Sequence, residues 1–226
     1  MTSSTPTDTD VSHRVHLRRG LLWRFLQLAV SPLFVLWVRL RIVGAENIDD
    51  RCGGILLLNH QSFLDPVVAG LRLKRPVSFL ARDGLFRVPF LGWILRNIYV
   101  LAISQTSFRG SSVRTAVERM EEGFLVGVFP EGSRSSGDVK KFRRGFLSLI
   151  RRVNVPVYPV GIVGGDRVFP RGAFFIRPGC MTVVYGKPLP QEECELLRNG
   201  TNDEELTELV RQRVSACMQA AAEIQS

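Results

Sequence analysis

The sequence predicts an α/β fold in which a largely parallel, mixed sheet is flanked by helices and preceded by an N-terminal helical segment. Short apolar runs rich in Val, Ile, Leu and Phe recur along the chain and alternate with helical patterns about ten residues long. Reactive polar side chains directly follow two of these runs, which is where open α/β sheets place their active sites.

The N-terminal part differs from the rest in composition. Residues 1–12 are small and polar, which predicts a disordered tail. Residues 13–40 begin with a basic cluster and continue as an apolar stretch that Arg24, Gln27 and Pro32 interrupt. No small-residue cleavage site follows, so a signal peptide does not fit. The clean apolar run is shorter than the roughly 20 residues that a bilayer requires, which argues against a single spanning helix.

We therefore interpret residues 13–40 as a membrane-associated pair of short helices, broken near Pro32 and lying in the bilayer interface. Trp23 and Trp37 would lie at headgroup depth, with arginines reaching lipid phosphates. Two alternatives stay open: one spanning helix, or an ordinary helix packed on the core.

Residues 41–226 are expected to form one domain, because the chain has 226 residues, is 45% hydrophobic and shows no linker or repeat. The apolar runs place strands at residues 41–43, 55–58, 77–81, 98–103, 124–129, 157–163 and 181–185. Helical periodicity places helices at residues 63–73, 85–96, 111–122, 142–152 and 202–224. The last of these opens with a capping-box pattern, whereas Gly164–Arg167 is expected to be only a turn.

Charge and cysteine usage bound the partners. The formal charge is +9, with 30 basic and 21 acidic residues, which suggests a polyanionic partner. No basic stripe interleaved with aromatic residues is present, so nucleic acid is not expected. The four Cys lack metal-binding spacing and fit reduced thiols in the cytosol. With only three His, no protein-built zinc site is expected.

The first reactive stretch holds His60 and Asp65, just beyond the apolar run 55–58. On one continuous helix these two side chains would point about 140° apart, so they can meet only if the chain turns between them. Ser62 is a good N-cap for a helix that would start near Phe63. Asp65 would then lie at the positive end of this helix and hold one nitrogen of the imidazole.

The second reactive stretch is Phe129–Arg134, which follows the apolar run 124–129. Together, Asn59-His60-x-x-x-x-Asp65 and Phe-Pro-Glu-Gly-Ser-Arg resemble the first and third motifs of the glycerolipid acyltransferase family. The resemblance covers roughly residues 40–190 and implies a glycerol-3-phosphate acyltransferase-like fold. Supporting matches are Phe79–Arg82, Pro89–Trp93, Phe142–Gly145 and Val155–Val160.

One departure from the family concerns the second motif, which usually ends a strand with an Arg that helps bind the substrate phosphate. Here the matching strand runs into Gln105, and the nearest Arg is Arg109. Arg82 and, less directly, Arg144 are candidates to supply the charge that Gln105 lacks.

The resemblance implies O-acyltransferase chemistry, with His60 and Asp65 as the catalytic residues. His60 would take the proton of an acceptor hydroxyl that attacks an acyl thioester, while Asp65 orients the imidazole. Backbone N–H groups near the Gly132 turn, or at the helix start near Phe63, would face the oxyanion. The resemblance assigns acceptor binding to Glu131 and Arg134, whose planar guanidinium suits a phosphate.

The implied substrates are an acyl-CoA or acyl carrier protein donor and 1-acyl-sn-glycerol-3-phosphate, with phosphatidic acid as the product for phospholipid synthesis. No cofactor or metal is expected, because a thioester is already activated. Such lipids imply an enzyme at the cytoplasmic face of an anionic membrane. Alternatives are another lyso-acceptor, such as a lysophospholipid or an acylated amino-acid lipid, or a non-catalytic lipid-binding protein. The Gly/Ser-rich segment 132–137 lacks the ending of a P-loop, and no Gly-x-Ser-x-Gly elbow is present.

Overall fold

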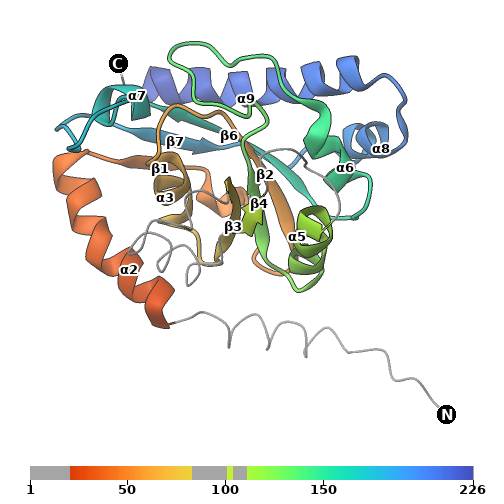
Figure 1. The fold of residues 1–226 in the computed structure, drawn as a ribbon, viewed down its shortest axis with the longest axis horizontal. Helices are drawn as coiled ribbons and strands as arrows, with labels where there is room; N and C mark the ends of the chain where they lie inside the picture. Colours follow the sequence, from red (N-terminus) through yellow and green to blue (C-terminus); the bar gives the residue numbers. More distant parts are fainter. Residues whose placement is uncertain (1–20, 83–100, 104–110, 226) are drawn as a thin grey trace.

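The computed structural model describes residues 21–82, 101–103 and 111–225, and in these residues one sheet lies between two layers of helices (Figure 1). The sheet has seven strands in the order β1-β7-β6-β2-β5-β3-β4. All neighbouring strands are parallel except the antiparallel pair β6 and β7. The strands are β1 (Arg41–Val43), β2 (Gly54–Leu58), β3 (Val77–Arg82), β4 (Leu101–Ile103), β5 (Leu125–Val128), β6 (Val157–Val163) and β7 (Thr182–Tyr185). The predicted largely parallel, mixed sheet is confirmed.

The α-helices are α2 (Leu21–Pro32), α3 (Asp65–Gly70), α5 (Ser111–Glu121), α6 (Leu147–Ile150), α7 (Gly165–Val168), α8 (Gln191–Asn199) and α9 (Asp203–Gln225). Short 3-10 turns cover Ala45–Asn47 and Arg144–Phe146. The helices predicted for residues 111–122 and 202–224 are confirmed. The helix predicted for 85–96 lies outside the described residues, and so do the strand residues 98–100.

Several helical segments differ from the sequence prediction, including the helix predicted for residues 63–73, which is the shorter α3. The helix expected at residues 142–152 is a 3-10 turn followed by the short helix α6. A turn is predicted at residues 164–167, whereas Gly165–Val168 form the helix α7. Helix α8 was not predicted, although Glu192 and Glu193 in its first turn and Arg198 in its last are the charges that a helix dipole favours. Its short length and sparse apolar positions hid it from a search for periodicity.

The central strand β2 divides the core into two clusters, one on each face of the sheet. Ile55 and Leu57 pack with side chains of α5, α6, α8 and α9. Leu56 and Leu58 pack on the other face with side chains of α3 and the N-terminal segment. All four side chains are completely buried. An unbroken aliphatic run is typical of such a strand, because helices cover both of its faces.

The N-terminal helix does not break at Pro32. Pro32 keeps helical dihedral angles, and the chain continues as a π-helix over Leu33–Trp37. Proline lacks the N–H that the i→i−4 ladder needs, so the backbone changes from α to the wider π form at this point instead of separating into two helices. The prediction of a helix pair broken near Pro32 is therefore wrong.

This segment also packs on the domain. Phe34 and Val38 are buried in the core, and the side-chain amide of Gln27 donates to the carbonyl oxygens of Gly70 and Leu73 at 2.9 and 3.2 Å. The opposite side is exposed and apolar, with Phe25, Leu28, Leu36 and Trp37. Within the described parts of the chain, no helix combines the length and apolar character needed to cross a bilayer. The tail predicted for residues 1–12 lies outside the described residues.

Candidate active site

The two reactive stretches meet at one edge of the sheet. Leu57 of β2 pairs with Val128 of β5, so the residues that follow both strands leave the sheet side by side. The imidazole of His60 stacks on the ring of Phe129, with centroids 4.2 Å apart. Phe129 in turn stacks on Phe79 of β3 at 5.6 Å. The aromatic stack fixes the plane of the imidazole.

The predicted contact between His60 and Asp65 is present. Nδ1 of His60 lies 2.8 Å from Oδ2 of Asp65, the first residue of α3. The same oxygen accepts the backbone N–H groups of Gln61 at 2.6 Å and Ser62 at 2.8 Å. An ionised carboxylate only accepts hydrogen bonds, so Nδ1 donates its proton and Nε2 carries the lone pair. The His60 side chain keeps 17% of its surface exposed, which leaves Nε2 a route to substrate.

Ser62 is not the N-cap, contrary to the sequence prediction. The helix starts at Asp65 and has Leu64 at its N-cap position. The Asp65 carboxylate itself accepts the N–H groups of Gln61 and Ser62. The hydroxyl of Ser62 instead donates to the carbonyl oxygen of Phe169 at 3.0 Å. Ser62 therefore ties the turn at the catalytic pair to the loop that follows α7.

A glycine closes the other side of the carboxylate. The N–H of Gly165 donates to Oε1 of Gln61 at 3.2 Å. A Cβ at position 165 would lie 2.8 Å from Oδ1 of Asp65 and 3.0 Å from Cβ of Ser62. Oδ1 itself is buried and has no hydrogen-bond partner. Gly165 lies two residues after the end of β6, the other neighbour of β2, and this position is the signal that could have identified it.

Glu131 holds the backbone of the site. Its Oε1 accepts the N–H of His60 at 2.8 Å, and its Oε2 accepts the hydroxyl of Ser135 at 2.7 Å and the N–H of Lys140 at 3.3 Å. The N–H of Ser135 donates to the carbonyl oxygen of His60 at 2.7 Å. Glu131 is buried, with both oxygens bound by the protein. These contacts position the backbone at His60, and the acceptor contact that the family resemblance implies for Glu131 stays a prediction.

Arg134 lies at the opening of the site. Its guanidinium stacks 3.8 Å from the centroid of the Phe63 ring, in the turn between His60 and Asp65. Arg171, which no sequence motif identifies, donates to the carbonyl oxygen of Arg134. Partial burial, and then the charge of Arg171, lower the pKa of the Arg134 guanidinium, while Asp65 acts in the opposite direction. Within the described residues neither Arg134 nor Arg171 forms an ion pair with a carboxylate. No carboxylate of the described residues therefore neutralises these two cations, and an anionic group would stabilise them.

Gly132 has a structural reason to be glycine. Its φ is +68°, and a Cβ there would lie 2.8 Å from Nε of Arg143. Its N–H donates to the carbonyl oxygen of Phe129 at 3.0 Å, so this group is not free for an oxyanion. Oxyanion donors near the Gly132 turn would therefore have to be other N–H groups than that of Gly132, and the turn at Phe63 is the second predicted location.

The other two predicted arginines are Arg82 and Arg144, and the structure places the side chain of Arg144 alone. Arg82 is the last residue of β3, and its side chain lies outside the described part of the structure. Arg144 is exposed and acts electrostatically on Glu204 of α9. Its neighbour Arg143 is the residue that packs against Gly132. In the basic run 140–144, a sequence gives no means of deciding which arginine faces the site.

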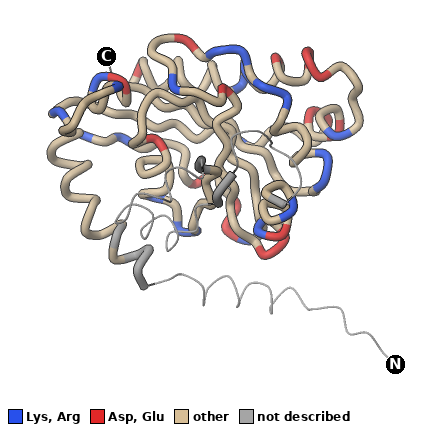
Figure 2. The backbone as a smooth tube through the Cα atoms, in the orientation of Figure 1, with Lys and Arg blue, Asp and Glu red and all other residues tan. Residues whose placement is uncertain are grey.

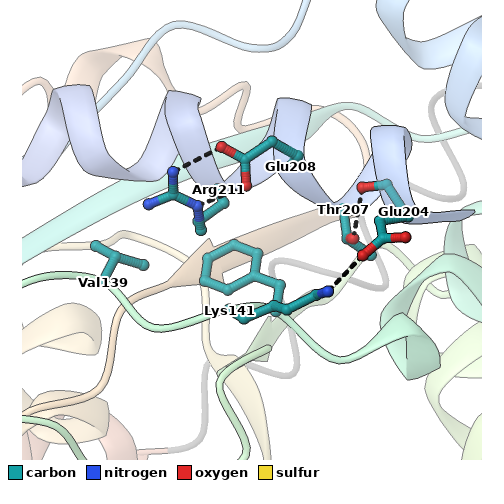
Figure 3. Close-up of a pocket in the computed structure, with 7 residues that line it drawn as sticks. Val139, Lys141, Glu204, Thr207, Glu208 and Arg211 are labelled. Atoms are coloured by element: carbon teal, nitrogen blue, oxygen red, sulfur yellow. Dashed lines mark hydrogen bonds and ion pairs between the residues drawn. The ribbon is translucent and has the colours of Figure 1, made fainter.

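A surface hollow between α9 and residues 139–142 does not belong to this site (Figure 3). Its charged groups are paired with one another: Lys141 with Glu204, and Arg211 with Glu208 at 2.6 Å. None of the residues lining it is among the candidate catalytic or binding residues. We assign it no function.

Comparisons with known proteins identify the family of the chain. The acyltransferase family model matches residues 39–163. The chain is 24% identical over 194 residues to the 1-acyl-sn-glycerol-3-phosphate acyltransferase of Bacillus subtilis. This match covers 85% of this chain and 95% of the Bacillus protein. It is 31% identical over 171 residues to the protein of the same name from Saccharomyces cerevisiae, with 70% of this chain and 54% of that protein covered.

A solved structure has the same fold. The chain matches the 1-acyl-sn-glycerophosphate (LPA) acyltransferase PlsC from Thermotoga maritima with a TM-score of 0.71 and 24% identity, over 96% of this chain and 87% of that one. The family model covers more than half of the 226 residues and includes both reactive stretches. The chain belongs to the acyltransferase family, among the relatives of the 1-acyl-sn-glycerol-3-phosphate acyltransferases, and is an O-acyltransferase.

Proposed function

We propose that the protein transfers a fatty acyl group from a thioester to the free hydroxyl of 1-acyl-sn-glycerol-3-phosphate and so forms phosphatidic acid. One observation carries the choice of acceptor. The guanidinium groups of Arg134 and Arg171, which form no ion pair with a carboxylate of the described residues, lie beside the turn that holds His60 and Asp65. A phosphomonoester on the acceptor would neutralise them while its hydroxyl reaches the imidazole. The names of the relatives support the same acceptor.

The proposed reaction uses His60 as a general base and then as a general acid. Nε2 takes the proton of the acceptor hydroxyl as its oxygen attacks the thioester carbonyl. The imidazolium faces the Asp65 carboxylate through Nδ1. When the tetrahedral intermediate collapses, the C–S bond breaks and the thiolate takes the proton from Nε2. The cycle returns His60 to its starting state, and the chemistry needs no resident cofactor.

Replacing Arg134 with Ala is expected to raise the KM for 1-acylglycerol-3-phosphate by roughly 10- to 100-fold, because a charge-assisted contact to phosphate is lost. The turnover number should change little, since Arg134 does not touch the reacting atoms. Arg144→Ala is the matched control: it removes an equally basic residue that faces α9. An unchanged KM in the Arg134 variant, or an equal rise in both variants, would place the phosphate elsewhere. A panel of lyso-acceptors would then identify the true acceptor.

Replacing Glu131 with Gln is expected to lower the turnover number roughly tenfold with little effect on either KM. The NH₂ group of Gln would replace one of the two carboxylate oxygens of Glu131. It would then face either the N–H of His60, or the hydroxyl of Ser135 and the N–H of Lys140, all of which are donors. One of those buried donors loses its acceptor, which costs about 1–3 kcal/mol and loosens the backbone at His60. Glu118→Gln, on the exposed face of α5, is the control. A rise in acceptor KM alone would instead support direct substrate binding by Glu131.

The acyl donor is proposed to be acyl-CoA or acyl carrier protein. A thiol-release assay with acyl-CoA and with acyl carrier protein would distinguish the two donors. We infer attachment to the cytoplasmic face of a membrane, because the apolar side of residues 25–37 is exposed and all four Cys are unpaired. Deleting residues 1–40 would not test this attachment cleanly, since Phe34 and Val38 are core residues. Point substitutions on the exposed side are the appropriate variants.

A further inference from the structure

The loop between α7 and β7, residues 169–180, presents two adjacent phenylalanines to solvent. Phe174 is 92% exposed and Phe175 is 83% exposed, more than any other large apolar side chain in the described parts of the chain. Neither belongs to a core cluster. Exposed single apolar residues are common on protein surfaces, but two fully exposed neighbouring aromatic rings are an unfavourable arrangement in water.

The backbone of this loop is held in place, so the exposure does not come from a frayed end. The N–H of Arg177 donates to the carbonyl oxygen of Val168 at 2.9 Å and closes the loop. The indole N–H of Trp37 donates to the carbonyl oxygen of Ile176 at 3.0 Å, and the N–H of Gly179 donates to the carbonyl oxygen of Trp37 at 3.2 Å. The loop is thus fixed to the end of the N-terminal helical segment, and Figure 1 shows the two next to each other.

The same loop is joined to the active site. The hydroxyl of Ser62 donates to the carbonyl oxygen of Phe169, and Arg171 donates to that of Arg134. Other exposed apolar side chains lie on the elements that the loop contacts: Leu36 beside Trp37, and Phe63 under the Arg134 guanidinium. The exposed phenylalanines, the apolar side of the N-terminal segment and the opening of the site are therefore connected by direct contacts.

The charged residues around Phe174 and Phe175 indicate what kind of partner covers the two rings. Arg171 and Arg177 flank the two phenylalanines and are exposed. Basic residues lie in this part of the molecule (Figure 2). Aromatic rings bordered by arginines fit the boundary between the acyl chains and the anionic headgroups of a bilayer. A protein partner would require a complementary acidic surface and is not needed to explain the arrangement.

We propose that the loop 169–180 is a membrane-contact element that inserts Phe174 and Phe175 into an anionic lipid surface beside the opening of the active site. This rests on the proposed function, since a lipid acceptor must pass from the bilayer to His60. Insertion next to Arg134 would shorten that path. It would also explain why the loop is tied both to the N-terminal segment and to the site.

The test uses the full-length protein carrying Phe174→Ser and Phe175→Ser, with Leu196→Ser as the control. Leu196 is also exposed, but lies on α8, away from the loop. Partition onto vesicles of phosphatidylcholine and phosphatidylglycerol is measured by sedimentation. Each phenylalanine that leaves water favours binding, so the double variant should bind roughly tenfold or more weakly, and the control should bind like the parent protein. Turnover of a long-chain acceptor in vesicles should fall, while that of a short-chain, water-soluble acceptor should not.

Unchanged partition of the double variant would overturn the proposal, and so would an equal loss of turnover with both acceptors. Self-association of the parent protein without lipid that the double variant abolishes would assign the loop to contact between two copies, which also overturns it. A wrong acceptor gives a different pattern. The parent protein would then fail to acylate both the long-chain and the short-chain 1-acylglycerol-3-phosphate. The double variant would still bind vesicles more weakly than the parent protein.

Discussion

Replacing His60 with Ala is expected to lower the turnover number by about 10²–10⁴-fold, the usual loss when a general base is removed. In the proposed reaction His60 fills this role. Nδ1 is held 2.8 Å from Asp65, which leaves Nε2 to accept the hydroxyl proton. The assay follows thiol release from the acyl donor with 1-acylglycerol-3-phosphate as acceptor.

The variant is expected to fold, because the anchors of this turn are mostly backbone contacts. The N–H of His60 donates to Glu131 and its carbonyl oxygen accepts from Ser135, and Ala keeps both groups. The ring contact with Phe129 is lost, so a small decrease in melting temperature is expected. A His60→Ala protein that retained more than about a tenth of the parent turnover would disprove base catalysis by this residue. A protein that unfolded at room temperature would show that the ring is needed for the fold.

The sheet could be predicted because its strands carry a signal within a few residues. Ile55 to Leu58 are all apolar, and no other element fits a run so short and so uniformly buried. The meeting of His60 with Phe129 could be predicted as well. Both follow parallel strands, and parallel strands that pair end at the same edge of the sheet.

Side-chain direction could not be predicted in the same way. Glu131 precedes Arg134 in one short motif, and both are charged, so a sequence gives them the same status. In the structure Glu131 turns inward to the backbone of His60, whereas Arg134 turns outward over Phe63. Arg143 and Arg144 present the same difficulty. The direction of each side chain depends on contacts between residues far apart in the sequence, which no local pattern encodes.

The N-terminal segment shows how a local rule can give the wrong element. Gln27 and Pro32 were interpreted as interruptions, since each is unfavourable in an isolated apolar helix. In the folded protein Gln27 finds two carbonyl acceptors at the end of α3 and in the residues after it, and Pro32 lies where the helix changes to its π form. The tertiary contacts make both residues compatible with one continuous helical run.

Replacing Asp65 with Asn is expected to lower the turnover number by about 10²–10³-fold, through the loss of a charge and not of geometry. Oδ2 accepts three N–H groups, so only the amide oxygen of Asn can occupy that position. The amide nitrogen must take the place of Oδ1, which has no hydrogen-bond partner to lose. The turn and the His60 tautomer are therefore retained. The imidazolium that forms during the reaction faces a neutral dipole, which stabilises it less than a carboxylate does.

This reasoning separates Asp65→Asn from Asp65→Ala. The Ala variant removes the acceptor of three N–H groups, so it should lose stability as well as activity, whereas the Asn variant should melt close to the parent protein. Adding Asp65→Asn to His60→Ala should cost almost nothing further, because Asp65 acts only through the imidazole and residues that act as a unit are not additive. Turnover numbers and melting temperatures of the four proteins in this cycle are the measurement. A double variant much slower than His60→Ala alone would mean that Asp65 contacts the substrate by itself, and its assignment as a partner of His60 would fail.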